Sequence, residues 1–302
     1  MDSLRKVLRN PLGLTGLLLI AFWAVIALSA PLICPPKNAN SPYTVKRVSY
    51  SSLPSPPSAK AILGTTGGGY DILYGIVWGS RNAFRVGLIV VSTTLVIGVL
   101  LGGLGAFAGG LVDEIVMRIT DLFMSFPFLI AVIVMSIVLG KGLDKVIIAL
   151  IVFGWRQYAR VMRSEVLSVK EKDFVSSARS LGMGSFRLFF RHVLPNSIFP
   201  VFVLASLDVG VTVLIAASLS FLGVGAEPGY ADWGQMINFA RSWLLGTNGE
   251  PFVYWYTYVW PSLTIISFVL GWTLLGDTLR DVLDPKLRNN LYGAKSPDRK
   301  GS

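Results

Sequence analysis

Long stretches with almost no charge constrain this sequence more than any other feature. Five segments carry at most one charged residue over a length that can cross a bilayer, which takes about 20 helical residues. They are Pro11–Ile33, Val86–Ala108, Leu122–Leu139, Ile198–Ala226 and Phe252–Gly276. Since 53% of the residues are apolar and the mean hydropathy is +0.61, the sequence predicts an all-α, multi-pass membrane protein and excludes a soluble enzyme.

The charges that flank a shorter apolar segment predict one more span. Val146–Trp155 is free of charge for only ten residues, but basic residues near membrane ends favour the cytoplasmic side. They are concentrated at the N-terminus, in residues 156–192 and in the C-terminal tail. Only an even number of crossings places all three on one side. We therefore expect six transmembrane helices, one of them at Leu143–Tyr158, with both termini cytoplasmic in the cell membrane.

This topology divides the chain into three parts. Residues 1–85 contain the cytoplasmic start, the first span and a Pro- and Ser-rich external loop. Residues 86–288 form a five-helix core with a cytoplasmic loop at 156–197 and an external loop at 223–253. Residues 289–302 form a cytoplasmic tail that is expected to be disordered. Within the first external loop, residues 62–82 predict a turn followed by a short amphipathic helix. The first apolar run is too long for a cleavable signal peptide.

The composition argues against catalytic or metal-binding chemistry. One cysteine, Cys34, and one histidine, His192, cannot supply a disulfide framework, a Cys/His zinc site or a Cys–His nucleophilic pair. No P-loop occurs, so we expect no catalytic residue, no metal and no cofactor on this chain. The net charge of +10 comes largely from basic residues at membrane ends, which indicates contact with membrane lipid and no nucleic-acid binding.

One glycine-rich segment resembles a nucleotide-binding motif but lies in the wrong context. Gly103–Ala108 fits the pattern G-x-G-x-x-A, yet it falls inside an uncharged span with no βαβ unit around it. We interpret it as part of a helix face that allows close packing in the membrane, formed by Gly98, Gly102, Gly105 and Gly109.

The cytoplasmic loop predicts two short helices. Asp173 can cap a helix at Phe174–Leu181, in which Phe174, Ala178 and Leu181 form an apolar stripe, and Gly182 can end it. Ser185 can then cap a second helix at Phe186–Leu194, ended by Pro195. Such a pair can insert into a groove on a soluble partner, or its apolar stripe can lie back against the membrane helices.

At these residues the chain resembles the permease subunits of binding-protein-dependent ABC importers. Their cytoplasmic loop has the pattern Glu-Ala-Ala…Gly…Ile-x-Leu-Pro, which here is Ser176-Ser177-Ala178, Gly182 and Val193-Leu194-Pro195 with His192 before it. The second permease of the dipeptide, oligopeptide and nickel importers is the closest in pattern. Further segments that resemble it are Leu63-Gly64-Thr65-Thr66 with Gly69-Tyr70-Asp71, Ser218–Gly223, Asp232-Trp233-Gly234 and Leu275–Pro285.

The resemblance implies a type I ABC importer permease fold and a set of partners. These are a second, homologous permease in a heterodimer, two ATPase subunits that bind ATP and Mg, and an external substrate-binding protein. The residues implied in coupling to the ATPases are Phe174, Ser176, Ser177, Ala178, Arg179, Gly182, Leu194 and Pro195, and those implied in the external loops are Asp71 and Trp233. Peptides are the expected substrates, with oligosaccharides or chelated nickel as alternatives.

Three departures from the family pattern change the local chemistry. Ser176 replaces the glutamate of the cytoplasmic loop, so coupling is expected to depend on shape and on nearby arginines. Thr66 and Tyr70 replace an acidic and a basic residue of the external motif. We expect these two replacements to change the polar contacts of that loop and the class of substrate.

One carboxylate falls inside a span, and intramembrane carboxylates are functional by default. Asp208, with Thr212 one turn away, is expected either to bond to a neighbouring helix or to line the translocation pathway. It also leaves open an ion-coupled secondary carrier as a different class of function. An intramembrane aspartyl protease is excluded, because Asp71 and Asp277 fall at opposite membrane faces in this topology.

Overall fold

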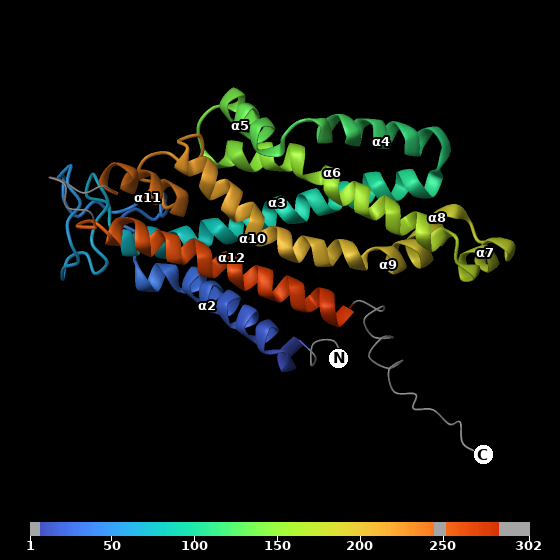
Figure 1. Ribbon diagram of the computed structural model, residues 1–302, viewed down its shortest axis with the longest axis horizontal. Coiled ribbons are helices and arrows are strands. Elements are labelled where there is room, and N and C mark those ends of the chain that lie inside the picture. Colours follow the sequence, from blue (N-terminus) through green and yellow to red (C-terminus); the bar gives the residue numbers. More distant parts are fainter. Residues whose placement is uncertain (1–6, 245–251, 284–302) are drawn as a thin grey trace, which may run out of the picture.

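The computed structural model describes residues 7–244 and 252–283 (Figure 1). This part of the chain is helical, with isolated β-bridges and no β-strand. Its elements are α2 Pro11–Ile33, α3 Ile72–Ala108, α4 Gly110–Ser125, α5 Phe128–Leu139, α6 Leu143–Lys170, α7 Asp173–Ser180, α8 Ser185–Leu188, the π-helix η1 Phe189–Val193, α9 Leu194–Ser197, α10 Phe199–Phe221, α11 Trp233–Ala240, the 3-10 helix η2 Arg241–Trp243 and α12 Tyr256–Leu283.

Four helices are long and apolar enough to cross a membrane. They are α2, α3, α10 and α12, and the bent pair α4–α5 brings the number of candidate spans to five. The bounds of α2 match the first predicted span, and Asn10 caps it by accepting a hydrogen bond from the Leu12 amide (2.9 Å). The chain is therefore an integral membrane protein.

The predicted span at Leu122–Leu139 is not one unbroken helix. The chain breaks after Ser125, and α4 and α5 meet at an angle of 87°. Pro127 stands at the break, since proline has no amide hydrogen to donate and disfavours a helical conformation in the residue before it.

The separate amphipathic helix expected within residues 62–82 is also wrong. Ile72 begins α3, a single helix of 37 residues that includes the predicted span Val86–Ala108. The Asp71 side chain caps it by accepting from the Tyr74 amide (3.2 Å). No proline interrupts the sequence between the two predicted helices, so they join.

The predicted span Leu143–Tyr158 lies within α6, which continues without a break to Lys170. The first part of the loop expected at 156–197 is therefore helical. α6 has four charged residues within Leu143–Arg160, whereas each of the four candidate spans contains an 18-residue apolar stretch with at most two.

The α3–α6 packing is the most extensive contact between two helices in the structure. A Cβ at Gly102 would lie 2.1 Å from the Ala159 carbonyl oxygen, and one at Gly98 would lie 2.4 Å from the Tyr158 Cβ. The predicted packing role is confirmed for these two glycines. Gly109 has a different role, because it ends α3 at φ +71° with no neighbour around it.

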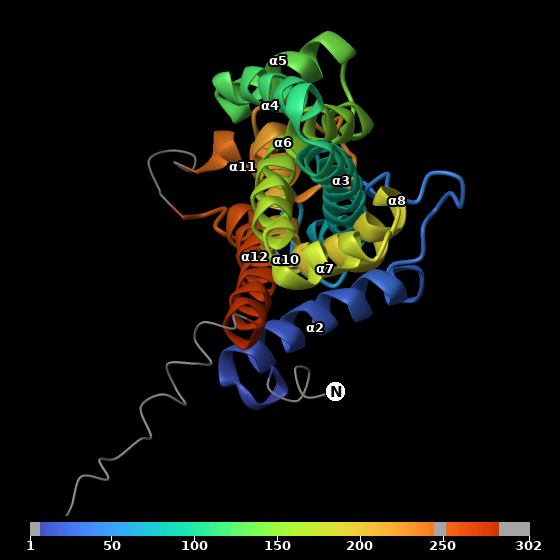
Figure 2. The same cartoon turned by 90° about the vertical axis from the view of Figure 1, so that its right-hand side faces the viewer.

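The two ends of the bundle differ in structure. At one end, residues 34–71 form an irregular cap that is hydrogen-bonded to the segment before α11, with Val45 N donating to Gly229 O (2.8 Å) and Ala231 N to Tyr43 O (2.7 Å). At the other end lie α7 and α8 (Figure 1). Figure 2 shows α4 and α5 on one side of the bundle and α2 on the other.

We predict that Gly102→Ala destabilises the protein, because the added methyl group overlaps the α6 backbone. The expected cost is about 1–3 kcal/mol, typical of overpacking. Gly105→Ala is the matched control, since its Cβ would meet Val116 at an ordinary 3.4 Å. Thermal unfolding of the detergent-solubilised protein measures both variants. Equal melting temperatures for the two would contradict the close α3–α6 contact.

Candidate functional site

A pair of short helices projects from the end of α6. Lys170 ends α6, α7 follows after a two-residue turn, and α8 with η1 leads back toward the membrane helices. Figure 2 shows α7 and α8 at the end of the bundle nearest the viewer. We call the segment 173–197 the cytoplasmic helix pair, after the side of the membrane that the sequence predicts for it.

Buried apolar side chains attach the cytoplasmic helix pair to the bundle. Val175, Leu188 and Phe189 are at most 2% exposed and belong to one buried cluster with Met162 and Val166 of α6. The same cluster includes residues of α3 and α10. The helix pair therefore packs into the same core as α3, α6 and α10.

The turn between the two helices depends on Gly182. The Met183 amide donates to Ala178 O (3.2 Å) and the Gly182 amide to Arg179 O (3.0 Å), the hydrogen-bond pattern of a Schellman cap. Gly182 has φ +79° with no atom near the position of a Cβ. A side chain there is strained by the backbone conformation and not by crowding. The prediction that the helix ends at Gly182 is confirmed by this backbone conformation.

The predicted apolar stripe divides between two surroundings. Ala178 faces the bundle together with Val175, while Leu181 is 87% exposed and Phe174 is also exposed. Phe186 of α8 is 77% exposed and packs on Phe190. The outer surface of the pair therefore has exposed apolar side chains among polar neighbours. The other predicted coupling residues are distributed around it: Ser176, Ser177, Arg179 and Pro195 are exposed and Leu194 is half-buried.

Three local expectations for this segment are wrong. Asp173 and Ser185 are the first residues of α7 and α8, and neither side chain caps its helix. Pro195 does not end the second helix, because the chain passes from α8 through η1 into α9 and Pro195 occupies its first turn. Proline is tolerated there since the amide of a first-turn residue needs no partner within the helix.

Lys170 is a residue that sequence reasoning did not single out. Its Nζ donates to the carbonyl oxygens of Ala106 (2.8 Å) and Phe107 (3.0 Å), the last residues of α3. A cation at a helix C-terminus satisfies free carbonyls and interacts favourably with the helix dipole. Phe107 also contacts Phe189 of η1. The end of α3 is thus fixed to the base of the cytoplasmic helix pair.

Asp208 forms a hydrogen bond to a neighbouring helix. Its Oδ2 accepts from the Tyr158 hydroxyl (2.7 Å), which joins α10 to α6. The sequence predicted a neighbouring helix as one possible partner without naming the residue, and the structure has a tyrosine fifty positions earlier in the chain. Thr212 lies one turn further along α10 and is half-buried.

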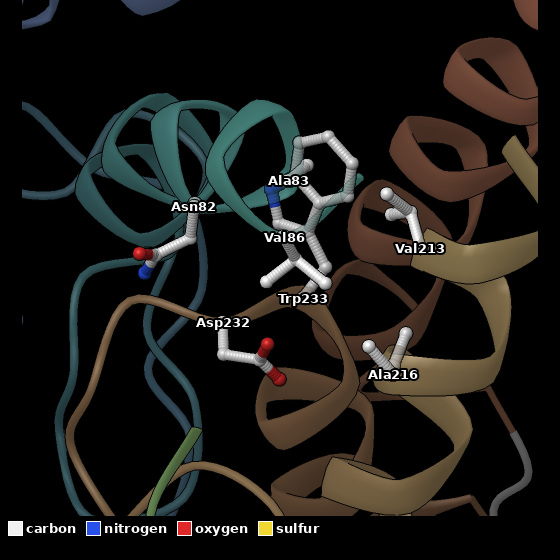
Figure 3. Close-up of a pocket in the computed structure, with 9 residues that line it drawn as sticks. Asn82, Ala83, Val86, Val213, Ala216, Asp232 and Trp233 are labelled. Atoms are coloured by element: carbon white, nitrogen blue, oxygen red, sulfur yellow. The ribbon is translucent and has the colours of Figure 1, made fainter. Parts of the chain in front are cut away.

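The residues predicted in the external loops, Asp71 and Trp233, lie at the end of the bundle opposite α7 and α8, where they stabilise the fold. Asp71 caps α3, and Trp233 is buried, with its Nε1 donating to Ile76 O (3.1 Å). Beside Trp233, Asp232 is 8% exposed and caps α11 by accepting from the Gln235 amide (2.8 Å). Figure 3 shows its carboxylate at a small cavity between α3 and α10, near Val86 and Ala216. Burial raises the pKa of Asp232 to about 6.

These features define a class of protein. Apolar candidate spans, and a helix pair that is anchored in their shared core and partly exposed, describe an integral membrane protein with a projecting surface at one end.

The family is identified by comparison with known proteins. Residues 94–289 match the family described as binding-protein-dependent transport system inner membrane component, and the chain belongs to it. It is 33% identical to a dipeptide transport system permease protein DppC of Alkalihalophilus pseudofirmus over 95% of this chain and 90% of the relative. It is 36% identical to a glutathione transport system permease protein GsiD of Pectobacterium atrosepticum, over 95% and 89%. It is 33% identical to an oligopeptide transport system permease protein OppC of Bacillus subtilis, over 95% and 90%.

We predict that Asp232→Asn changes the pH dependence of stability. Because the folded-state pKa is raised, the folded protein binds this proton more tightly than the unfolded chain, and stability falls as pH rises from about 4 to about 6. Asparagine keeps the capping oxygen without the charge. The variant should therefore gain stability relative to wild type between pH 4.5 and 7.5, by at most about 3 kcal/mol.

Thermal unfolding of the solubilised protein across this pH range measures the difference. Glu227→Gln, at an exposed position of the same segment, is the control and should gain less, since an exposed carboxylate stays solvated. Parallel pH profiles for Asp232→Asn and wild type would contradict a buried charge.

Proposed function

We propose that this chain forms half of the translocation pathway for peptides in an ATP-driven importer. The observation that carries the proposal is the match along 95% of the chain to relatives named as dipeptide, oligopeptide and glutathione permeases. The chain itself makes and breaks no bond. ATP and Mg bind to two partner ATPase subunits, and an external binding protein delivers the substrate.

The proposed topology has six spans. They are α2, α3, the bent pair α4–α5, α6, α10 and α12. Both termini and the cytoplasmic helix pair lie inside the cell, and residues 34–71 and 223–253 lie outside. Residues 34–71 and 223–244 lie at one end of the bundle and α7 and α8 at the other, which supports this orientation (Figure 1). A second, non-identical permease supplies the other half of the pathway.

The cytoplasmic helix pair is the proposed docking site for an ATPase. Its exposed Phe174, Leu181 and Phe186 offer an apolar surface, and Arg179 and Arg187 beside them offer positive charge. Because Val175 and Phe189 anchor the pair in the core, closure of the ATPases can tilt α3, α6 and α10 and open the pathway to alternate sides.

We predict that the assembled complex imports peptides with ATP as its only energy source. Proteoliposomes that contain both permeases and the ATPases, with ATP inside and loaded binding protein outside, should take up a radiolabelled dipeptide with proton and sodium gradients collapsed. Omission of ATP is the control. Uptake of an oligosaccharide or a nickel chelate instead would overturn the substrate class. Uptake by this chain alone, driven by an ion gradient and lost in Asp208→Asn, would establish an ion-coupled carrier.

We predict that Gly182→Asp weakens ATPase docking. A side chain at φ +79° costs about 1 kcal/mol or more, and the variant should retain several-fold less ATPase on co-purification and transport correspondingly less. Gly184→Asp introduces the same charge two residues away at φ −63°, without strain, and should have a smaller effect. Normal ATPase recovery and import by Gly182→Asp would show that docking does not depend on this turn.

A further inference from the structure

Several charged side chains lie deep along α6. Lys170 marks the level at which α3 ends, through its bonds to Ala106 and Phe107. Arg156 is fourteen residues before Lys170, which at 1.5 Å per residue places it about 21 Å further along the bundle. The apolar core of a bilayer is about 30 Å thick. Arg156 therefore lies at the depth of the hydrocarbon, and Arg160 lies one turn below it.

The packing of α3 on α6 also places Arg156 well inside the uncharged run of α3. Gly98 lies against Trp155 and Tyr158, the neighbours of Arg156 in sequence. Gly98 is about 15 Å from the end of α3, in the middle of a long uncharged run. The level of Arg156 is thus fixed by two helices.

Most charges near this level are paired across α4 and α6. Arg163 binds Asp113 through two hydrogen bonds of 2.7 Å, and Arg160 binds Asp121. The Arg160 and Asp121 side chains are 53% and 56% exposed. Exposed ions at hydrocarbon depth are costly against lipid and occur where a protein lines an aqueous cavity. This face of α4 and α6 is therefore directed toward water and not toward acyl chains.

Arg156 differs from its neighbours because it has no carboxylate partner among residues 7–244 and 252–283. Its guanidinium lies 4.6 Å from the centre of the Phe128 ring, one NH group donates to Phe153 O, and its buried Nε has no hydrogen-bond partner. A guanidinium is suited to bind a carboxylate with two parallel hydrogen bonds.

The break between α4 and α5 lies beside this arginine. Phe128 is the first residue of α5, and Phe123 of α4 packs on Phe153 and Trp155. Non-helical backbone at membrane depth is tolerated where it is buried in protein or lines a water-filled cavity. The break, the exposed ion pair and the unpaired arginine thus meet in one region.

We propose that this region is a water-filled part of the translocation pathway in which Arg156 binds the free carboxylate of a peptide in transit. The inference rests on the proposed function for its substrate and on the geometry of this chain for its position. The Asp121–Arg160 pair keeps the cavity hydrated and adds no net charge, so Arg156 supplies the positive charge that attracts the carboxylate.

The first test measures water access without reference to any substrate. In a Cys34→Ser background, Gln157→Cys places a thiol at an exposed position one turn from Arg160. In proteoliposomes that contain the whole complex, the water-soluble anionic reagent 2-sulfonatoethyl methanethiosulfonate should label it in the nucleotide-free or the vanadate-trapped state. Leu18→Cys, exposed on the uncharged α2, should stay unlabelled. Protection of Gln157→Cys in both states would overturn the proposal and place this face against the second permease.

The second test assigns the carboxylate. Uptake of a dipeptide and of its C-terminal amide is compared at equal concentrations of loaded binding protein. Arg156→Gln should lower the maximal rate for the free acid roughly tenfold, the scale of one charge-assisted hydrogen bond, with no change in the concentration of binding protein that gives half-maximal rate. Arg156→Lys should restore part of it, and the amide should be carried equally by wild type and Arg156→Gln.

The outcomes separate the two proposals. Equal losses for acid and amide, or loss of the second permease on purification of Arg156→Gln, would overturn carboxylate binding. Failure of wild type to import any peptide would overturn the proposed substrate, while labelling of Gln157→Cys would still locate the aqueous face.

Discussion

The close approach of α3 and α6 is the contact on which the rest of the structure depends. Gly98 and Gly102 let the α6 backbone approach α3 to a distance that a single methyl group would prevent. At the end of this contact, Lys170 binds the last carbonyls of α3. The two helices are thereby fixed in register. Everything that α6 carries, including the cytoplasmic helix pair and the arginines facing α4, takes its position from this register.

Ion pairs hold α4 along the side of α6. Arg163 binds Asp113 and Arg160 binds Asp121. A straight span through Leu122–Leu139 would continue in the direction of α4, but Pro127 turns the chain by 87°. The result is an amphipathic arm that has ion pairs on one face and exposed apolar residues on the other.

The cytoplasmic helix pair combines two requirements in very few residues. Val175, Ala178, Leu188 and Phe189 bury their side chains against α6, so the pair moves with the bundle. Phe174, Leu181 and Phe186 stay exposed, so the pair presents an apolar surface to a partner. Helical periodicity placed Phe174, Ala178 and Leu181 on one face, which could lie against the membrane helices or face a partner. In the structure Ala178 is buried against the bundle, while Phe174 and Leu181 are exposed.

The sequence by itself determined the helical membrane class, the bounds of α2, the glycine turn at Gly182 and the packing role of Gly98 and Gly102, because these follow from local composition and backbone chemistry. It also carried the family pattern that indicated a permease. The single helix at 72–108 and the bend at Pro127 also have local causes in the sequence, although they were not predicted from it. Only the tertiary structure decided that Tyr158 meets Asp208 and that Lys170 caps α3. These two contacts depend on residues from distant parts of the chain meeting in space. No periodicity within one segment specifies which side chain of another helix lies opposite it.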